Sequence, residues 1–193
     1  MQPNPNLNKL IRDRYSPIIF QDKPIEPEKV ELLFEAARWA PSSYNEQPWR
    51  YFAGVKGTNA WQQIFDLLAE GNQTWTKDVP FLVISVASMK YAKNDKDNRH
   101  GYHDTGMATE NLVLQATDLG LHVHQMGGFD EVKAAEVFEL PPDFEAVAVA
   151  AIGYKGDEAD LTGDMKERAD DPRTRRELSE TVFEGTFGNA FKF

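Results

Sequence analysis

The sequence predicts an α+β or α/β fold in which about four strands are flanked by about four or five helices. Two continuous apolar runs, 81–87 and 146–152, have the length of buried strands. Other segments carry apolar residues at helical spacing, most clearly after Pro27 and after Asp104. The 193-residue chain has an ordinary length for one domain, so we expect residues 1–193 to form a single unit.

The first half of the chain predicts a helix, a strand, a helix and a strand, in that order. Pro27 suits the first helical position, and Ile25 and Val30 are spaced to form a hydrophobic staple around it. This helix should stop before Pro41. We expect a strand at 49–55, a helix at 60–69 that Gly71 ends, and the buried strand at 81–87.

The second half predicts a long buried helix, two short elements and a last strand. The polar segment 90–99 reads as an exposed loop, after which Asp104 is the expected N-cap and Gly120 the stop of a helix. Apolar residues surround this helix, so it should be buried in the core or at a subunit interface. We expect a strand at 123–126, a helix at 130–138 and a strand at 146–152.

The C-terminal tail, residues 156–193, is first charged and then aromatic. It ends with four phenylalanines in eleven positions, Phe183, Phe187, Phe191 and Phe193. The tail has no obvious core of its own, and exposed aromatic residues at this density usually cover a partner surface. We therefore expect the tail to wrap a second subunit.

The composition excludes several classes of function. A formal net charge of −10 without a basic stripe argues against nucleic-acid binding. The absence of cysteine excludes thiol catalysis, disulfides and thiolate metal sites. No apolar run approaches the roughly 20 residues that cross a bilayer, and the polar, proline-bearing start does not resemble a signal peptide, so we expect a cytoplasmic protein.

Two arginine clusters are the strongest candidates for binding a phosphate. One holds Arg12 and Arg14, with Ser16 close by; the other holds Arg173, Arg175 and Arg176. A guanidinium offers a planar fork of donors, and a serine hydroxyl adds a further hydrogen bond. The alternative is a surface loop with a solvated arginine.

A second candidate is the loop at residues 40–49, which is rich in small polar residues between two prolines. Its amides, hydroxyls and carboxamides suit a flat heteroaromatic ligand that has several hydrogen-bonding edges. A rigid connection without a ligand is the alternative. The four histidines, in two close pairs, suggest a metal site, but the second pair lies on a predicted strand and no carboxylate motif accompanies it, so we expect no metal.

Together these segments resemble the FMN-dependent nitroreductase family over nearly the whole chain. The motifs appear in the expected order: Arg14-x-Ser16, Pro41-Ser42-Ser43-x-Asn45-x-Gln47-Pro48-Trp49, Asn72, the helical Asp104 to Asn111, Gly127-Gly128-Phe129 and a basic cluster near the end. The resemblance implies a three-layer α+β sandwich with a mixed or antiparallel central sheet. It also implies a homodimer with two FMN sites shared between subunits.

The resemblance assigns cofactor contacts residue by residue. The expected FMN-binding set is Arg14, Ser16, Pro41, Ser42, Ser43, Asn45, Gln47, Asn72, Gln125, Gly127, Gly128, Arg175 and Arg176. Within it, the residues from Pro41 to Asn45 would come from the other subunit. The chain departs from the family at Ile18, where many members place a lysine or arginine; Lys77 and Arg50 are candidates to replace that cation.

The implied activity is a two-step, ping-pong reduction. NADH or NADPH would reduce FMN, and a nitroaromatic, quinone or similar small electrophile would then be reduced in the same pocket. The flavin carries the hydride chemistry, so no catalytic side chain is named. The chain has no Gly-x-Gly-x-x-Gly fingerprint for a separate dinucleotide domain. Alternatives are a flavin-fragmenting or dehalogenating relative, and a flavin-binding or sensing protein without turnover.

Overall fold

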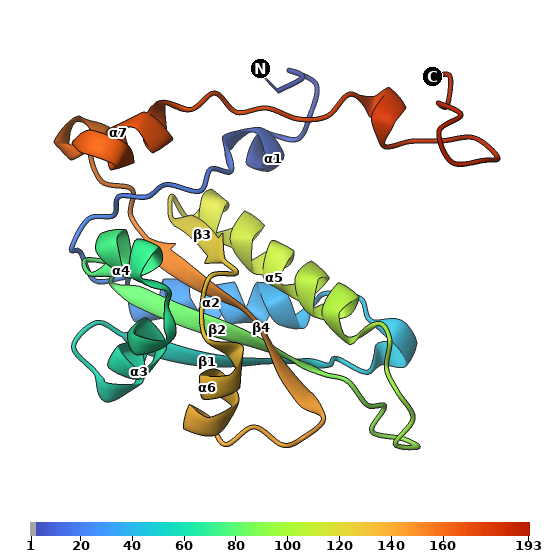
Figure 1. The fold of residues 1–193 in the computed structure, drawn as a ribbon, viewed down its shortest axis with the longest axis horizontal. Helices are drawn as coiled ribbons and strands as arrows, with labels where there is room; N and C mark the ends of the chain where they lie inside the picture. The colour runs from blue at the N-terminus through green and yellow to red at the C-terminus, as the bar shows by residue number, and fades with distance from the viewer. Residues whose placement is uncertain (1–2) are drawn as a thin grey trace.

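The chain is built around one antiparallel sheet, seen in a computed structural model that describes residues 3–193 (Figure 1). The strands are β1 (Trp49–Val55), β2 (Phe81–Ser88), β3 (His122–Met126) and β4 (Phe144–Gly153). Their order across the sheet is β1-β2-β4-β3, and every neighbouring pair is antiparallel. Strand β2 is almost entirely buried, as expected for a continuous apolar run in the middle of a sheet.

Helices cover both faces of this sheet. They are α1 (Lys9–Asp13), α2 (Pro27–Arg38), α3 (Asn59–Leu67), α4 (Glu70–Thr76), α5 (Gly101–Asp118), α6 (Glu131–Val137) and α7 (Gly163–Asp170). Three short 3-10 turns lie at Ser43–Asn45, Glu158–Asp160 and Leu178–Glu180.

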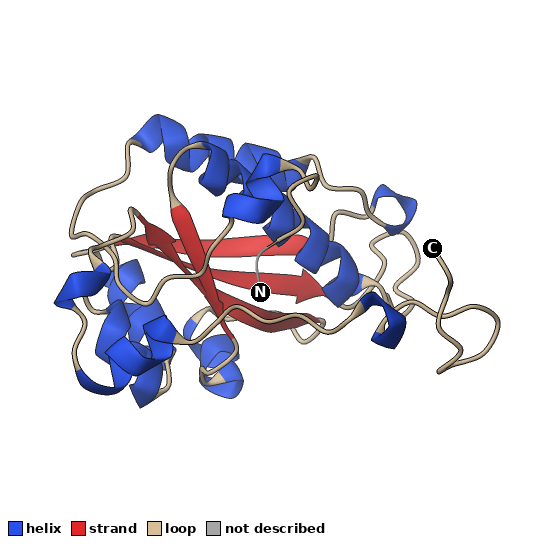
Figure 2. Ribbon diagram, turned by 90° about the horizontal axis from the view of Figure 1, so that it is seen from above, coloured by secondary structure: helices blue, strands red, loops and turns tan. Residues whose placement is uncertain are grey.

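Two apolar cores separate three layers, and Figure 2 shows helices on both sides of the strands. One core joins the sheet to α2 and α5 and includes Leu33, Ala108 and Leu112. The other joins the opposite face to α3, α4 and α6 and includes Ile64 and Trp75. The expected α+β three-layer sandwich with an antiparallel sheet is therefore confirmed.

The start of α2 follows from its sequence. Pro27 occupies the first helical position after Glu26, and Ile25 and Val30 both pack against the core on this side of the sheet. This arrangement is the hydrophobic staple that the sequence predicts. The helix ends at Arg38, before Pro41.

The expected end of the second helix at Gly71 was wrong. Helix α3 ends at Leu67, and Gly71 is the second residue of the next helix, α4. The break comes earlier because Leu68 is extended and forms a bridge with Phe129, so pairing with a distant segment, not a glycine, separates the two helices.

The expected N-cap of the long helix was also wrong. Helix α5 begins at Gly101, so Asp104 lies in its first turn and is only 2% exposed. A Cβ at Gly101 would lie 2.6 Å from the carbonyl oxygen of Ser88. A residue without a side chain therefore lets the helix begin directly against the end of β2.

The tail divides into two parts. Its first part packs on the body of the same chain, since Met165 and Ala169 of α7 contact the core beside α3 and α4. Beyond α7 the chain runs past α1 and away from the sheet (Figure 1). There Phe187 and Phe193 are 95% and 81% exposed, so the terminal aromatic residues are largely uncovered within one chain. Across residues 3–193, no helix combines the length and the apolar character needed to cross a membrane.

Candidate functional site

The Arg14–Ser16 segment leaves α1 as a short extended stretch beside the sheet. Asn8 caps the start of α1 by accepting from the Leu10 amide, and Arg14 caps its end. From this position the Arg14 guanidinium donates to Ser16 Oγ over 3.1 Å. The two side chains that the sequence singles out therefore point toward each other and present donors in one place.

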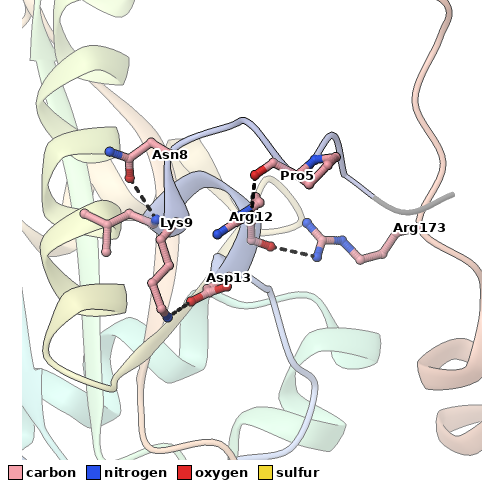
Figure 3. Close-up of polar contacts among 7 residues, drawn as sticks. Pro5, Asn8, Lys9, Arg12, Asp13 and Arg173 are labelled. Carbon is pink, nitrogen blue, oxygen red and sulfur yellow. Dashed lines mark hydrogen bonds and ion pairs between the residues drawn. The ribbon is translucent and has the colours of Figure 1, made fainter.

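The C-terminal arginine cluster meets this segment. Arg173 donates to the carbonyl oxygen of Arg12 at 3.4 Å, as Figure 3 shows. It also donates to the carbonyl oxygen of Arg14 at 3.2 Å. A cavity of about 270 Å³ lies at this junction. Its lining comprises Pro3, Asn4, Leu7, Ile11, Arg14, Arg173 and Arg175.

Three arginines line one cavity of a strongly acidic protein, which makes this cavity a candidate site for an anion. Arginine keeps its charge at all ordinary pH values and offers several donors to phosphate oxygens. Arg173 and Arg175 line the cavity, whereas Arg176 is exposed and is not among the lining residues. Sequence reasoning noticed Arg173 in the cluster but left it out of the expected contacts. Its two-residue spacing from Arg175 was the available signal.

A second group of expected residues meets between α4 and the end of β3. Asn72 Nδ2 donates to the Gly128 carbonyl over 2.9 Å, and the Ala69 amide donates to the same oxygen over 2.9 Å. A Cβ at Gly128 would lie 2.9 Å from Asn72 Nδ2, so glycine is what allows this close approach. Gln125 is exposed near the end of β3, and a Cβ at Gly127 would meet open space. This edge offers backbone and carboxamide groups that a planar ligand could approach closely.

The loop from Pro41 to Gln47 is held in a strained conformation. Tyr44, Asn45 and Gln47 have φ values of 53°, 58° and 51°, in the left-handed region that side chains other than glycine rarely adopt. Such strain persists only where surrounding contacts impose it, and it is concentrated at functional sites. Here the Ser42 hydroxyl accepts from the Gln47 amide over 3.0 Å, which closes the loop on itself.

Contacts to other elements fix the same loop from outside. The Ser43 amide donates to the buried Asp104 carboxylate over 2.9 Å, and the Ser43 hydroxyl lies 3.2 Å from the Tyr91 hydroxyl. Pro41, Asn45 and Gln47 remain exposed. The loop is therefore a rigid, outward-facing surface.

The loop and the α4–β3 edge lie at opposite edges of the sheet, because the loop adjoins β1, Gly127 and Gly128 follow β3, and β1 and β3 are the two outer strands. The loop immediately precedes β1, and α3 and α4 follow the other end of that strand. Figure 1 shows the same separation, with α4 far from the start of β1. Within one chain, the expected residues thus form two separate surfaces, with the arginine cavity beside the Arg14 segment.

Ile18 belongs to a core. It is 6% exposed and packs in the cluster that includes Phe20 and Trp75. Of the two candidate replacement cations, Arg50 donates to the carbonyls of Gln47 and Trp49, and Lys77 is exposed at the end of α4.

The two histidines of β3, His122 and His124, are partly buried in the fold. His124 Nδ1 lies 2.8 Å from the Pro17 carbonyl oxygen, and the ring packs on Trp75. Burial lowers the pKa of both His122 and His124. Within residues 3–193, no three or more His, Asp or Glu side chains gather in a way that could hold a metal ion.

This arrangement suits a ligand with a phosphate at one end and a flat, polar ring at the other. The fit of a phosphate rests on the cavity of Arg14, Arg173 and Arg175 with Ser16 nearby. The fit of a ring rests on the open backbone at Gly127 and on the glycine at position 128. FMN has both features, and the residues present are compatible with it.

Comparison with known proteins gives a consistent family. The model of the Nitroreductase family matches residues 11–74 and 55–154 of this chain. A solved structure described as an oxidoreductase containing FMN is 34% identical, with a TM-score of 0.90, over 97% of this chain and 96% of that one.

Two further relatives agree. A nitroreductase family protein of Clostridium difficile has a TM-score of 0.71 and 25% identity over 92% of this chain and 97% of its own. A protein of Archaeoglobus fulgidus named "Putative NADH dehydrogenase/NAD(P)H nitroreductase" is 29% identical over 157 residues, which are 79% of this chain and 87% of the relative.

Proposed function

This chain belongs to the nitroreductase family, and from that premise we propose that it is an FMN-dependent oxidoreductase. It uses NADH or NADPH to reduce nitroaromatic, quinone or similar small electrophilic acceptors. The observation that carries the proposal is the cavity lined by Arg14, Arg173 and Arg175, with Ser16 Oγ accepting a hydrogen bond from Arg14. In a protein of net charge −10, three arginines lining one cavity favour a ligand with a concentrated negative charge.

The residues divide by the part of FMN that each would hold. Arg14, Ser16 and Arg175 hold the phosphate, with Arg173 added by its place on the cavity and Arg176 from the same cluster. The ring would be held along the α4–β3 edge by Asn72, Gln125, Gly127 and Gly128. The other side of the site comprises Pro41, Ser42, Ser43, Asn45 and Gln47 of a second subunit.

The mechanism assigns binding and positioning to the protein. When bound, FMN supplies the reversible two-electron chemistry that lets one pocket serve the nicotinamide donor and then the acceptor in turn. The arginines would fix the phosphate. The hydrogen bond from Asn72 to Gly128 would hold the Gly127–Gly128 backbone in place beside the ring. The glycines leave room for a second substrate to approach the ring face. Backbone amides of the Gly127–Gly128 segment that faced the pyrimidine edge of the bound flavin would stabilise negative charge developing there.

The separation of the two surfaces supports a homodimer. A single chain places the strained loop beside β1 and the α4–β3 edge beside β3, on opposite edges of the sheet, so we expect one flavin to contact the loop of one subunit and the α4–β3 edge of the other. A two-fold axis brings the loop of one subunit to the edge of the other. The exposed aromatic tail, with Phe187 and Phe193 uncovered, provides apolar surface for this contact.

The test first identifies the bound chromophore and then measures enzymatic turnover of NADH and NADPH. The purified protein is denatured, and the released flavin is identified by chromatography; we expect FMN. Steady-state oxidation of NADH and of NADPH is then measured with a nitroaromatic or a quinone as acceptor. Recovery of FAD alone, or of no flavin after reconstitution, contradicts the cofactor assignment. Bound FMN without acceptor-dependent oxidation of either nucleotide contradicts the enzymatic assignment.

A further inference from the structure

We infer that His124 is a positioning residue for the cofactor phosphate. Its ring nitrogen holds the segment that carries Arg14 and Ser16 against β3, and so sets the distance between the phosphate-holding and ring-holding parts of the site. The inference rests on the proposed FMN function.

The contact itself is well defined. His124 Nδ1 lies 2.8 Å from the carbonyl oxygen of Pro17. A carbonyl oxygen only accepts, so Nδ1 carries the hydrogen and donates. Pro17 has no amide hydrogen, which makes this carbonyl its only backbone polar group. Pro17 is buried and directly follows Ser16, so the bond fixes the backbone at the end of the Arg14–Ser16 segment.

The ring is held in turn by α4. The His124 and Trp75 rings pack with centroids 4.7 Å apart and planes inclined by 39°. Trp75 lies three residues after Asn72 on α4, and residues at this spacing share a helix face. Asn72 bonds to the Gly128 carbonyl. Helix α4 therefore contacts the β3 segment at two places. One is His124, next to the segment that would hold the phosphate, and the other is Gly128, on the edge that would hold the flavin ring.

The protonation state agrees with this role. Burial is the main cause that lowers the pKa of His124, and the charge of Arg168 lowers it further, while the backbone groups of Pro17 and Ser16 oppose the shift. The neutral ring then has one hydrogen, which the Pro17 contact places on Nδ1. A histidine that only filled space in the core would not need either nitrogen in particular.

Two substitutions separate the hydrogen bond from the packing. His124→Asn keeps a donor the same number of bonds from Cβ as Nδ1 but loses the ring on Trp75. His124→Phe keeps the ring but loses the donor. Dissociation constants of FMN and riboflavin are measured on the flavin-free protein by flavin fluorescence, with Arg14→Ala as the reference for a damaged phosphate site.

We expect His124→Phe to weaken FMN binding by about three- to tenfold, the range for one hydrogen bond, and to leave riboflavin binding within about twofold. His124→Asn should keep FMN affinity within about twofold of the original protein. Equal losses for both ligands, or the same loss in both variants, would show that His124 acts only through packing.

The outcomes distinguish this inference from the proposed function. If the unmodified protein binds neither flavin, or binds riboflavin as tightly as FMN, the proposed phosphate site fails. If Arg14→Ala weakens FMN selectively and His124→Phe does not, only the role of His124 fails.

One measurement needs no variant and covers the case in which His124→Phe does not fold. A long-range nitrogen–proton correlation spectrum of the imidazole rings, recorded near neutral pH, reports which nitrogen carries the hydrogen. We expect hydrogen on Nδ1 of His124, and hydrogen on Nε2 alone overturns the inference.

Discussion

Arg14 shows how one side chain gains its role from residues far along the chain. Its guanidinium contacts Ser16, two residues away, while its carbonyl accepts from Arg173, 159 residues away. The sequence was sufficient to identify both arginine clusters, because grouped cations stand out in an acidic chain. It could not show that the clusters meet, since tertiary packing decides contacts between such distant segments.

Ile18 shows a case in which the resemblance to the family was not enough to explain a residue. The resemblance to the family drew attention to this position because a cation is common there. The structure places Ile18 at 6% exposure among Phe20, Trp75 and other apolar side chains. An ammonium group in these surroundings would lose its hydration without a partner. Isoleucine is therefore suited to this position because it packs in an apolar core, and only the burial of the side chain reveals this reason.

His122 gives a pH-dependent prediction at the residue scale. Its Nδ1 is buried without a hydrogen-bond partner among residues 3–193, and burial, assisted by the charge of Lys155, lowers its pKa. The unfolded chain therefore takes up this proton at a higher pH than the folded chain, so stability falls as pH drops below about 6.5. We expect His122→Gln to lose less unfolding free energy between pH of about 7.5 and about 5.5 than the original protein, measured by urea denaturation.

If His122→Gln loses as much stability on acidification as the original protein does, the histidine at 122 is not the group responsible.

At the scale of elements, the strained loop depends on a neighbouring helix. The three residues with positive φ, Tyr44, Asn45 and Gln47, need external contacts to keep their conformation. Asp104 provides one such contact from the first turn of α5, where a carboxylate also complements the helix dipole. The sequence identified Asp104 as important to the start of this helix but placed it at the N-cap. Aspartate is favourable both at the N-cap and in the first turn, so its presence does not distinguish the two positions.

We therefore expect Asp104→Ala to destabilise the protein by about 1.5–3 kcal/mol, because it removes a buried acceptor from the Ser43 amide. The free energy of unfolding is measured by denaturant titration, and exchange of the Ser43 amide hydrogen should become faster. Asp104→Asn retains an acceptor oxygen and should cost less.

Ser43→Ala is the matched control for that prediction. It removes the hydroxyl that faces Tyr91 but keeps the amide that donates to Asp104. Amide exchange at position 43 should stay slow in this variant. Slow exchange in Asp104→Ala as well would show that the carboxylate does not hold the loop.

Element prediction succeeded where hydrophobic patterns were long. Strands β2 and β4 and helices α2 and α5 follow from apolar runs or helical spacing over many residues. Helices α1, α4 and α7 have five, seven and eight residues and were not predicted. So short a helix has little periodicity of its own, and it forms because tertiary contacts such as those of Trp75 stabilise it.

At the scale of the whole molecule, the distribution of candidate residues matters more than any one of them. The arginine cavity involves both ends of the chain, since Pro3 and Arg175 line it together. The ring-holding edge lies between α4 and β3, and the strained loop adjoins β1 at the opposite edge of the sheet. Only the resemblance to the family divided these residues between two subunits, because order along a chain contains no information on which edge of a sheet a loop occupies.

If the site is shared between subunits, two defective variants should complement each other. Arg14→Glu damages the phosphate side of a site, and Ser43→Trp blocks the loop side. Each homodimer has both sites damaged. In a mixed dimer, the Arg14 side of the Ser43→Trp chain meets the loop of the Arg14→Glu chain, so one of the two sites is intact.

Random exchange makes about half of the dimers mixed, and one intact site in each predicts recovery of about a quarter of the original activity. The measurement is acceptor-dependent oxidation of NADH or NADPH, with exchange verified by isolating dimers that contain two different affinity tags. Arg14→Glu mixed with Arg173→Glu is the control, because both changes lie on the same cavity and leave no intact site in a mixed dimer. Recovery in this control would contradict the assignment of Arg14 and Arg173 to one half-site. Absence of recovery in the first mixture, despite verified exchange, would mean that each site is built within a single chain, and the strained loop would then need a role other than flavin binding.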